Sequence, residues 1–109
     1  MFKAASVIMA LNADPMKHRA SVKADEFEYT MVFIPLFDFD LAAQVSKDLV
    51  EKAGIQSISL CPGFSHEGVA KVQSVVGESV SVNVSPGDVP STMMTAQILS
   101  KEGWLPAEH

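Results

Sequence analysis

The loop at residues 61–68, with the sequence C-P-G-F-S-H-E-G, holds the largest group of reactive side chains in the chain. Cys61 ends an apolar segment and precedes a segment with helical periodicity. The N-terminus of a helix favours an anion, so a thiolate at Cys61 could have its pKa lowered below the free value of about 8.5. His66 is near enough along the chain to act as its base. The alternative is that Cys61 is a small buried hydrophobic side chain at the end of a strand.

The same loop has features of an anion-binding turn. Gly63 and Gly68 flank a helix start, where backbone N–H groups could hold a carboxylate or phosphate. Their spacing matches neither a P-loop nor a dinucleotide fingerprint. The alternative assigns Gly63 to a tight turn and Gly68 to close packing of the helix on the sheet. The loop residues that we expect at a ligand site are Gly63, Phe64, Ser65, Glu67 and Gly68.

A second polar segment, A-D-P-M-K-H-R, occupies residues 13–19. Asp14 and Arg19 could contact a polar or anionic ligand, and His18 is a second candidate partner for Cys61. The alternative is that these side chains form a solvated surface. Zinc ligands could be drawn from both polar segments, but nothing in their spacing marks such a site. We therefore expect neither a bound metal nor a cofactor.

Segments with strand or helix patterns must position these two loops. Strands are expected at residues 2–11, 27–35, 55–60 and 79–84. The first is an apolar run that could also be a buried helix, and Val7 and Ile8 favour a strand; the third is a short β-branched run, and the second and fourth alternate along their length. Apolar side chains at three- and four-residue spacing predict helices at 38–53, 65–76 and 91–102. Residues 15–19 suit a single helical turn that starts at an Asp-Pro pair. Residues 19–25 are polar and without a pattern, and suit a short extended return.

This order of elements predicts the fold class. Strands that alternate with helices imply βαβ crossovers, so we expect a single small α/β domain with a mostly parallel four-stranded sheet and two or three helices. A ferredoxin-like α+β sandwich is the alternative. The domain would span residues 1–109, with 86–109 as an appended helix and tail. Ligands of such sheets bind beyond the carboxyl ends of the strands, where both polar loops would meet if the strands are parallel.

Composition narrows the function classes. The 109 residues carry a net charge of −5 without any run of Lys or Arg, which argues against nucleic acid and anionic membranes as partners. No apolar run approaches the roughly 20 residues of a membrane span. The single cysteine cannot form an intramolecular disulfide, which fits a cytoplasmic protein. The apolar N-terminus suits a first strand better than a signal peptide. The final Glu108-His109 pair could begin an expression tag and is given no functional weight.

Two separated motifs resemble those of a small uncharacterised bacterial family, a domain of unknown function. That family has an A-D-P-x-K-H-R segment after its first strand, and an L-C-G-G-F-G turn followed by E-G-x-A-K. The matching stretches here are residues 13–19 and 60–71. Pro62 stands where the family has a glycine, which would stiffen the turn. The resemblance runs to about Val84 and finds no counterpart for the segment from Pro86 onward. It implies that the two loops belong together, and it supplies no reaction.

These observations together predict a bacterial, cytoplasmic homo-oligomer, a dimer or larger, that binds a small polar or anionic ligand around the loop at residues 61–68. They leave open whether the protein is an enzyme. In a catalytic version Cys61 is the nucleophile or acid/base, His66 or His18 is its partner, and Arg19 holds substrate charge. The alternative is a non-catalytic interaction protein that assembles through its apolar C-terminal segment.

Overall fold

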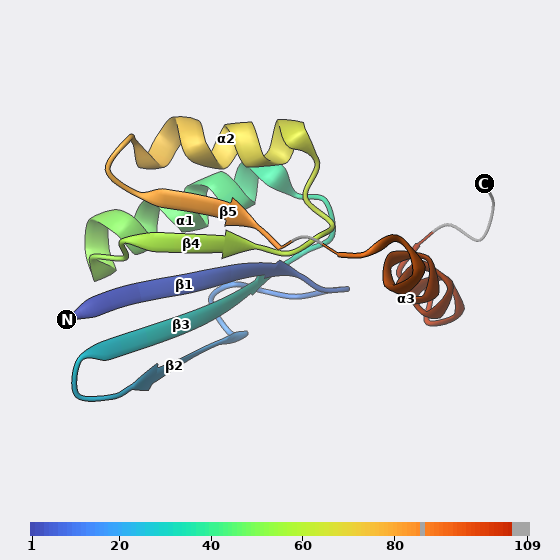
Figure 1. Ribbon diagram of the computed structural model, residues 1–109, viewed down its shortest axis with the longest axis horizontal. Helices are drawn as coiled ribbons and strands as arrows, with labels where there is room; N and C mark the ends of the chain where they lie inside the picture. Colours follow the sequence, from blue (N-terminus) through green and yellow to red (C-terminus); the bar gives the residue numbers. More distant parts are fainter. Residues whose placement is uncertain (86, 106–109) are drawn as a thin grey trace.

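A computed structural model describes residues 1–85 and 87–105, and the expected C-terminal tail beyond Leu105, with its Glu108-His109 pair, lies outside this range. Over these residues the chain forms five strands and three helices: three strands come first, and helices and strands then alternate (Figure 1). In chain order they are β1 (Phe2–Met9), β2 (Arg19–Lys23), β3 (Phe27–Ile34), α1 (Phe39–Ala53), β4 (Ser57–Leu60), α2 (His66–Val76), β5 (Ser81–Val84) and α3 (Val89–Lys101).

The five strands form one mixed sheet in the order β2-β3-β1-β4-β5. The pairs β1–β3, β1–β4 and β4–β5 are parallel, which confirms the α/β prediction and favours it over the ferredoxin-like alternative. β2 pairs antiparallel with β3 at one edge, so the expected extended return is a fifth strand rather than a loop. The carboxyl ends of the four parallel strands therefore share one edge of the sheet.

Local signals account for the bounds of the two helices that cover the sheet. The Asp38 side chain accepts a hydrogen bond from the N–H of Leu41 at 3.0 Å and begins α1. Gly54, at φ +73°, ends α1 in the left-handed conformation that favours glycine. The Ser65 side chain caps α2 by accepting from the N–H of Gly68 at 3.1 Å. α2 holds four valines, which disfavour an isolated helix, so its stability depends on packing.

The hydrophobic core lies between the sheet and the layer of α1 and α2. Figure 1 shows both helices on the same side of the sheet, and they also pack on each other. Alternate strand residues point into this core, as the pleat of a strand requires. The fully buried side chains include Val7, Val32, Ile34, Ile58, Leu60 and Val72.

The opposite face of the sheet has no such cover among the described residues. Phe2, Val22, Phe27 and Met31 are exposed there. α3 does not cover this face, because it stands beyond the carboxyl ends of the strands, at the opposite end of the molecule from the N-terminus (Figure 1). None of the residues of α3 is buried. A helix is therefore present in the C-terminal segment, and it projects from the α/β body.

None of the helices in the described part of the chain is long and apolar enough to cross a membrane.

Candidate functional site

A pocket of about 470 Å³ opens at the carboxyl ends of β1, β3 and β4, between the loops that follow these strands and the inner side of α3. Most of its lining is apolar, and among residues 1–85 and 87–105 none of the lining side chains carries a charge. The residues that line it are Met9, Leu36, Phe37, Cys61, Pro62, Gly63, Gly87, Ser91, Thr92, Thr95, Ala96, Leu99, Trp104 and Leu105.

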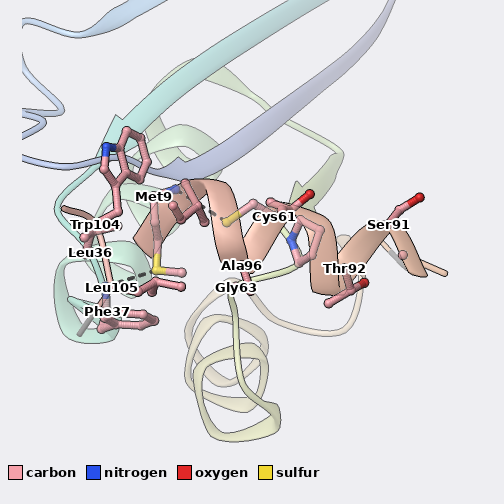
Figure 2. Close-up of a pocket in the computed structure, with 14 residues that line it drawn as sticks. Met9, Leu36, Phe37, Cys61, Gly63, Ser91, Thr92, Ala96, Trp104 and Leu105 are labelled. Carbon is pink, nitrogen blue, oxygen red and sulfur yellow. Dashed lines mark hydrogen bonds between the residues drawn. The ribbon is translucent and has the colours of Figure 1, made fainter. Parts of the chain in front are cut away.

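Two hydrogen bonds to sulfur tie the strand ends together at the floor of this pocket (Figure 2). The backbone N–H of Met9 donates to the Cys61 thiol at 3.5 Å, which joins the ends of β1 and β4. The backbone N–H of Phe37 donates to the Met9 thioether at 3.1 Å, which adds the loop after β3. Met9 is thus the central residue of the floor, and its side chain is almost fully buried.

Phe37 contributes an aromatic wall from a strained backbone position. Its φ is +59°, in the left-handed region that bulky side chains rarely adopt. Non-glycine residues in this region cost of the order of 1–3 kcal/mol and persist only where their surroundings hold them. Here the bond to Met9 and an edge-on contact with the Phe39 ring, 6.5 Å between centroids, hold the residue in place.

α3 supplies the opposite wall, and its start is well defined. The Asp88 side chain accepts from the N–H of Ser91 at 2.8 Å, and this backbone donor, helped by the Ser91 side chain, lowers the pKa of Asp88 below its ordinary value. The hydroxyls of Ser91, Thr92 and Thr95 are the main polar groups of the lining. After the helix, the N–H of Trp104 donates to the Leu99 carbonyl at 2.9 Å, which positions the indole at the mouth.

The loop at residues 61–68 divides between the pocket and the core. Cys61 and Gly63 line the pocket, and the Cys61 side chain is half-buried. A Cβ atom at Gly63 would lie 2.5 Å from the Met9 methyl group, so the turn passes directly over the Met9 side chain. Phe64 instead points into the core and packs on Phe39, with 5.4 Å between ring centroids.

The remaining residues of this loop build the start of α2. Ser65 is the helix cap, and Gly68 is buried where a Cβ would lie 2.7 Å from the Phe39 ring. His66 and Glu67 are exposed on the first turn of α2 and do not line the pocket. The structure therefore keeps Cys61 and Gly63 as pocket residues and gives Phe64, Ser65 and Gly68 packing and capping contacts.

The second expected group, Asp14, His18 and Arg19, lies between the end of β1 and the start of β2, away from the Cys61 pocket. There the N–H of Asp14 donates to His18 Nδ1 at 2.8 Å, and Arg19 Nε donates to the Pro15 carbonyl at 2.7 Å. These bonds stabilise a turn at residues 14–18, in which the N–H of His18 donates to the Asp14 carbonyl at 2.7 Å; the structure has no regular helix there, and Arg19 already begins β2. His18 and Arg19 border an open hollow of about 540 Å³ with Lys17 and Phe33, and none of these residues lines the Cys61 pocket. The two loops share the sheet edge but not a pocket.

Within residues 1–85 and 87–105, no three His, Cys, Asp or Glu side chains come together in a way that could hold a metal ion.

Several pocket residues lie outside the set expected from the sequence. Met9, Phe37 and Leu99 belong to apolar segments that resemble ordinary core sequence. Trp104 and Leu105 are the pocket residues that the sequence could have indicated, because they are apolar side chains that follow the predicted C-terminal helix. Cys61 is recognisable in the sequence because its side chain is reactive. The apolar side chains that form the cavity around it carry no such signal.

Comparison with known proteins gives one positive result. No curated protein and no solved structure matches the chain significantly. A family model described as a family of unknown function, DUF6506, matches residues 2–100. The match includes most of α3, so the relationship extends past Val84, where the motif resemblance ended. The chain belongs to the DUF6506 family of unknown function.

Proposed function

We propose that this protein binds a small, largely apolar molecule in the pocket between the Cys61 loop and α3. The supporting observation is the lining, in which apolar side chains from three loops and a helix converge around about 470 Å³. Ligand pockets in proteins commonly have volumes of about 300–1,000 Å³, with mostly apolar walls and a few polar groups. The hydroxyls of Ser91, Thr92 and Thr95 and the Cys61 thiol are the polar groups available to orient a ligand.

The absence of charge in the lining bears on the ligand class. A carboxylate or phosphate that enters an apolar site without a counter-charge loses hydration that nothing replaces. None of the described lining residues is Lys, Arg or His. The anionic ligand expected from the loop sequence is therefore less well supported than a neutral one that carries one polar group.

The lining also bears on catalysis. Cys61 is the only nucleophilic thiol of the chain, and a Cys–His mechanism needs an imidazole within hydrogen-bond reach of the sulfur. His66 and His18 both lie outside the pocket lining. Binding without covalent chemistry is the better supported function, with the Cys61 sulfur accepting from Met9 as part of the floor.

A panel of small ligands tests this proposal. Thermal unfolding is measured with neutral aromatic and aliphatic compounds, and with the carboxylate analogue of each compound. Because a ligand that binds only the folded state raises Tm by mass action, neutral members should raise Tm more than their matched carboxylates. Larger shifts with the carboxylates would contradict the proposal and restore the anion-binding hypothesis.

A second function, self-assembly, is favoured by a separate observation. Four large apolar side chains of α3, Val89, Met93, Met94 and Ile98, are more than half exposed on a helix that has only one charged residue, Lys101. Exposed apolar patches of this kind mark interaction surfaces in soluble proteins. We infer that the chain forms a homo-oligomer through α3, and sedimentation of the full chain tests this. We retain the cytoplasmic assignment as part of the proposal, supported by the unpaired Cys61. The bacterial assignment is supported by the motif resemblance alone.

A further inference from the structure

One face of the sheet is defined by the residues that alternate with the core residues. We call it the open sheet face, and it comprises Phe2, Ala4, Ser6, Ile8, Ala20, Val22, Phe27, Tyr29, Met31, Phe33, Ser57, Ser59, Ser81 and Asn83. The strand registers place these residues side by side, for example Phe2 beside Phe27 and Ser59 beside Asn83. None of them belongs to the core cluster under α1 and α2.

The open sheet face is uncharged. The charged residues of its strands, Lys3, Arg19, Lys23 and Glu28, all alternate to the helix-covered side, where Lys3 and Glu28 form an ion pair at 3.7 Å. The chain has eight basic and 13 acidic residues, so this segregation is not a consequence of low charge. A sheet face that faces water normally carries polar side chains. Serine and asparagine side chains meet this expectation on β4 and β5, but most of the side chains on β1, β3 and β2 are apolar.

Its larger half is a row of aromatic and aliphatic side chains across β1, β3 and β2. The Phe2 and Phe27 ring centroids lie 5.6 Å apart, and those of Phe27 and Tyr29 lie 6.0 Å apart. The Tyr29 hydroxyl is hydrogen-bonded to Ser6 on the same face, so its polar group is satisfied within the sheet. Val22, at 70% exposure, extends the row to the β2 edge. A partner that packs on this row would therefore contact apolar side chains, and it would not have to desolvate an unpaired tyrosine hydroxyl.

α3 carries a matching surface on its outer side. We call the residues Val89, Met93, Met94 and Ile98 the outer ridge; each is more than half exposed. They lie on the opposite side of the helix from Thr92, Thr95 and Leu99, which line the pocket of the same chain. At about 100° per residue, the two sets occupy opposite halves of the helix. The outer ridge therefore points away from its own α/β body.

We propose that the outer ridge of α3 from one copy packs on the open sheet face of a second copy, and that the same contact is made in return. α3 cannot make this contact with its own sheet while its inner side forms the pocket. A reciprocal exchange between two copies closes under twofold symmetry, the commonest arrangement of homo-oligomers, and leaves neither surface in water. The inference rests on the self-association proposed above and names its contact surfaces.

The available area suits such an interface. With about 150–200 Å² for a large side chain, the exposed apolar area of the two surfaces comes to roughly 800 Å² per chain, which is the share of one partner in an interface of standard size. Methionine is also frequent in interfaces because its unbranched side chain adapts to an uneven surface, and the outer ridge has two. The acidic net charge of each copy opposes association, so the dimer should tighten as salt screens this repulsion.

The test is sedimentation of the full chain with surface variants. Val22→Glu and Phe2→Glu place a charge on the open sheet face, and Met93→Glu and Ile98→Glu place one on the outer ridge. All four positions are at least half exposed in the single chain, so the fold should persist, and circular dichroism with thermal unfolding checks this. Val75→Glu is the matched control, because Val75 is an exposed valine on α2, away from both surfaces.

The expected result is a dimer for the wild-type chain and for Val75→Glu, and an at least tenfold weaker dimer for each of the four surface variants. Mixing a sheet variant with a ridge variant should recover part of the dimer, because one of the two contacts then joins two unchanged surfaces. A wild-type chain that stays monomeric at 100 µM would overturn self-association itself. A stable dimer that survives either the sheet variants or the ridge variants would overturn this assignment of surfaces and leave self-association standing.

Discussion

The backbone N–H of Phe37 donates a hydrogen bond to the thioether sulfur of Met9 at 3.1 Å, across the floor of the pocket. This contact joins the end of β1 to the loop after β3 and holds Phe37 in its left-handed conformation. Sulfur is a weak acceptor, yet here it accepts from the N–H of Phe37. This N–H lies in a strained turn and has no partner in the strand ladder. The shape of the pocket therefore depends on a methionine that the sequence presents as ordinary core.

Met9→Leu should destabilise the fold by about 1 kcal/mol beyond the small cost of the exchange itself, because the Phe37 N–H loses its acceptor while the core volume is kept. Urea unfolding measures the change. Met16→Leu is the control, since Met16 is 81% exposed and accepts no hydrogen bond from the described residues. Equal stability of the two variants would show that the sulfur contact contributes nothing.

Gly68→Ala should destabilise the protein by about 1–3 kcal/mol, even though alanine is the better helix former by about 1 kcal/mol. The reason is steric, because the new Cβ would lie 2.7 Å from the Phe39 ring of α1. Phe39→Leu should remove most of this penalty in the double variant, and a double-mutant cycle in urea measures the coupling. Additive effects of the two substitutions would contradict the close helix–helix contact.

Ser65→Ala should lower stability by about 1 kcal/mol and leave ligand affinity unchanged, because Ser65 caps α2 and does not line the pocket. Ser65→Asp keeps an acceptor at the cap and should retain stability close to wild type. Thermal unfolding and a binding titration are measured on both variants. A loss of affinity in Ser65→Ala at unchanged stability would return this residue to the ligand site.

Acid should loosen α3 through Asp88. The Ser91 N–H lowers the pKa of Asp88 in the folded chain, so the ionised cap stabilises the helix above the ordinary aspartate value of about 3.9. This contribution is lost as the pH falls through the lowered folded pKa. Asp88→Asn keeps a cap acceptor without the titration. Helical circular dichroism between pH 2 and 7 should show an acid transition in the wild-type chain that is smaller in Asp88→Asn. Identical profiles would exclude this role for the Asp88 carboxylate.

The sequence predicted an element correctly where its capping residues and its hydrophobic pattern agree with the packing of that element in the fold. The apolar stripe of α1, with Asp38 before it and Gly54 after it, predicted that helix to within one residue of its start. Apolar runs with β-branched residues predicted β1 and β4, and alternation of side chains predicted β3 and β5. β2 was missed as a strand because all its residues are exposed and its order comes from pairing with β3. Side-chain pattern carries little information about an edge strand of this kind.

The candidate site was predicted less well, for a related reason. Reactive residue types drew attention to Cys61, His66, His18 and Arg19, of which only Cys61 lines the apolar pocket. The pocket itself arises where α3 stands off from the strand ends, and no local pattern fixes the position of a helix after a short turn. The alternation of Phe27, Tyr29, Met31 and Phe33 was visible in the sequence, but only the structure shows that their side of the sheet lacks a helix layer.

The central claim, an apolar ligand pocket beside α3, is tested most directly through Trp104, the only tryptophan of the chain and a pocket residue. Its emission is recorded during titration with bromobenzene, a small apolar quencher. Ala96→Phe fills the pocket from α3, and Ala70→Phe is the matched control on an exposed position of α2. We expect saturable quenching in the wild-type chain and in Ala70→Phe, and its loss in Ala96→Phe. Quenching that rises linearly without saturation, or that is unchanged in Ala96→Phe, would contradict the pocket as a binding site.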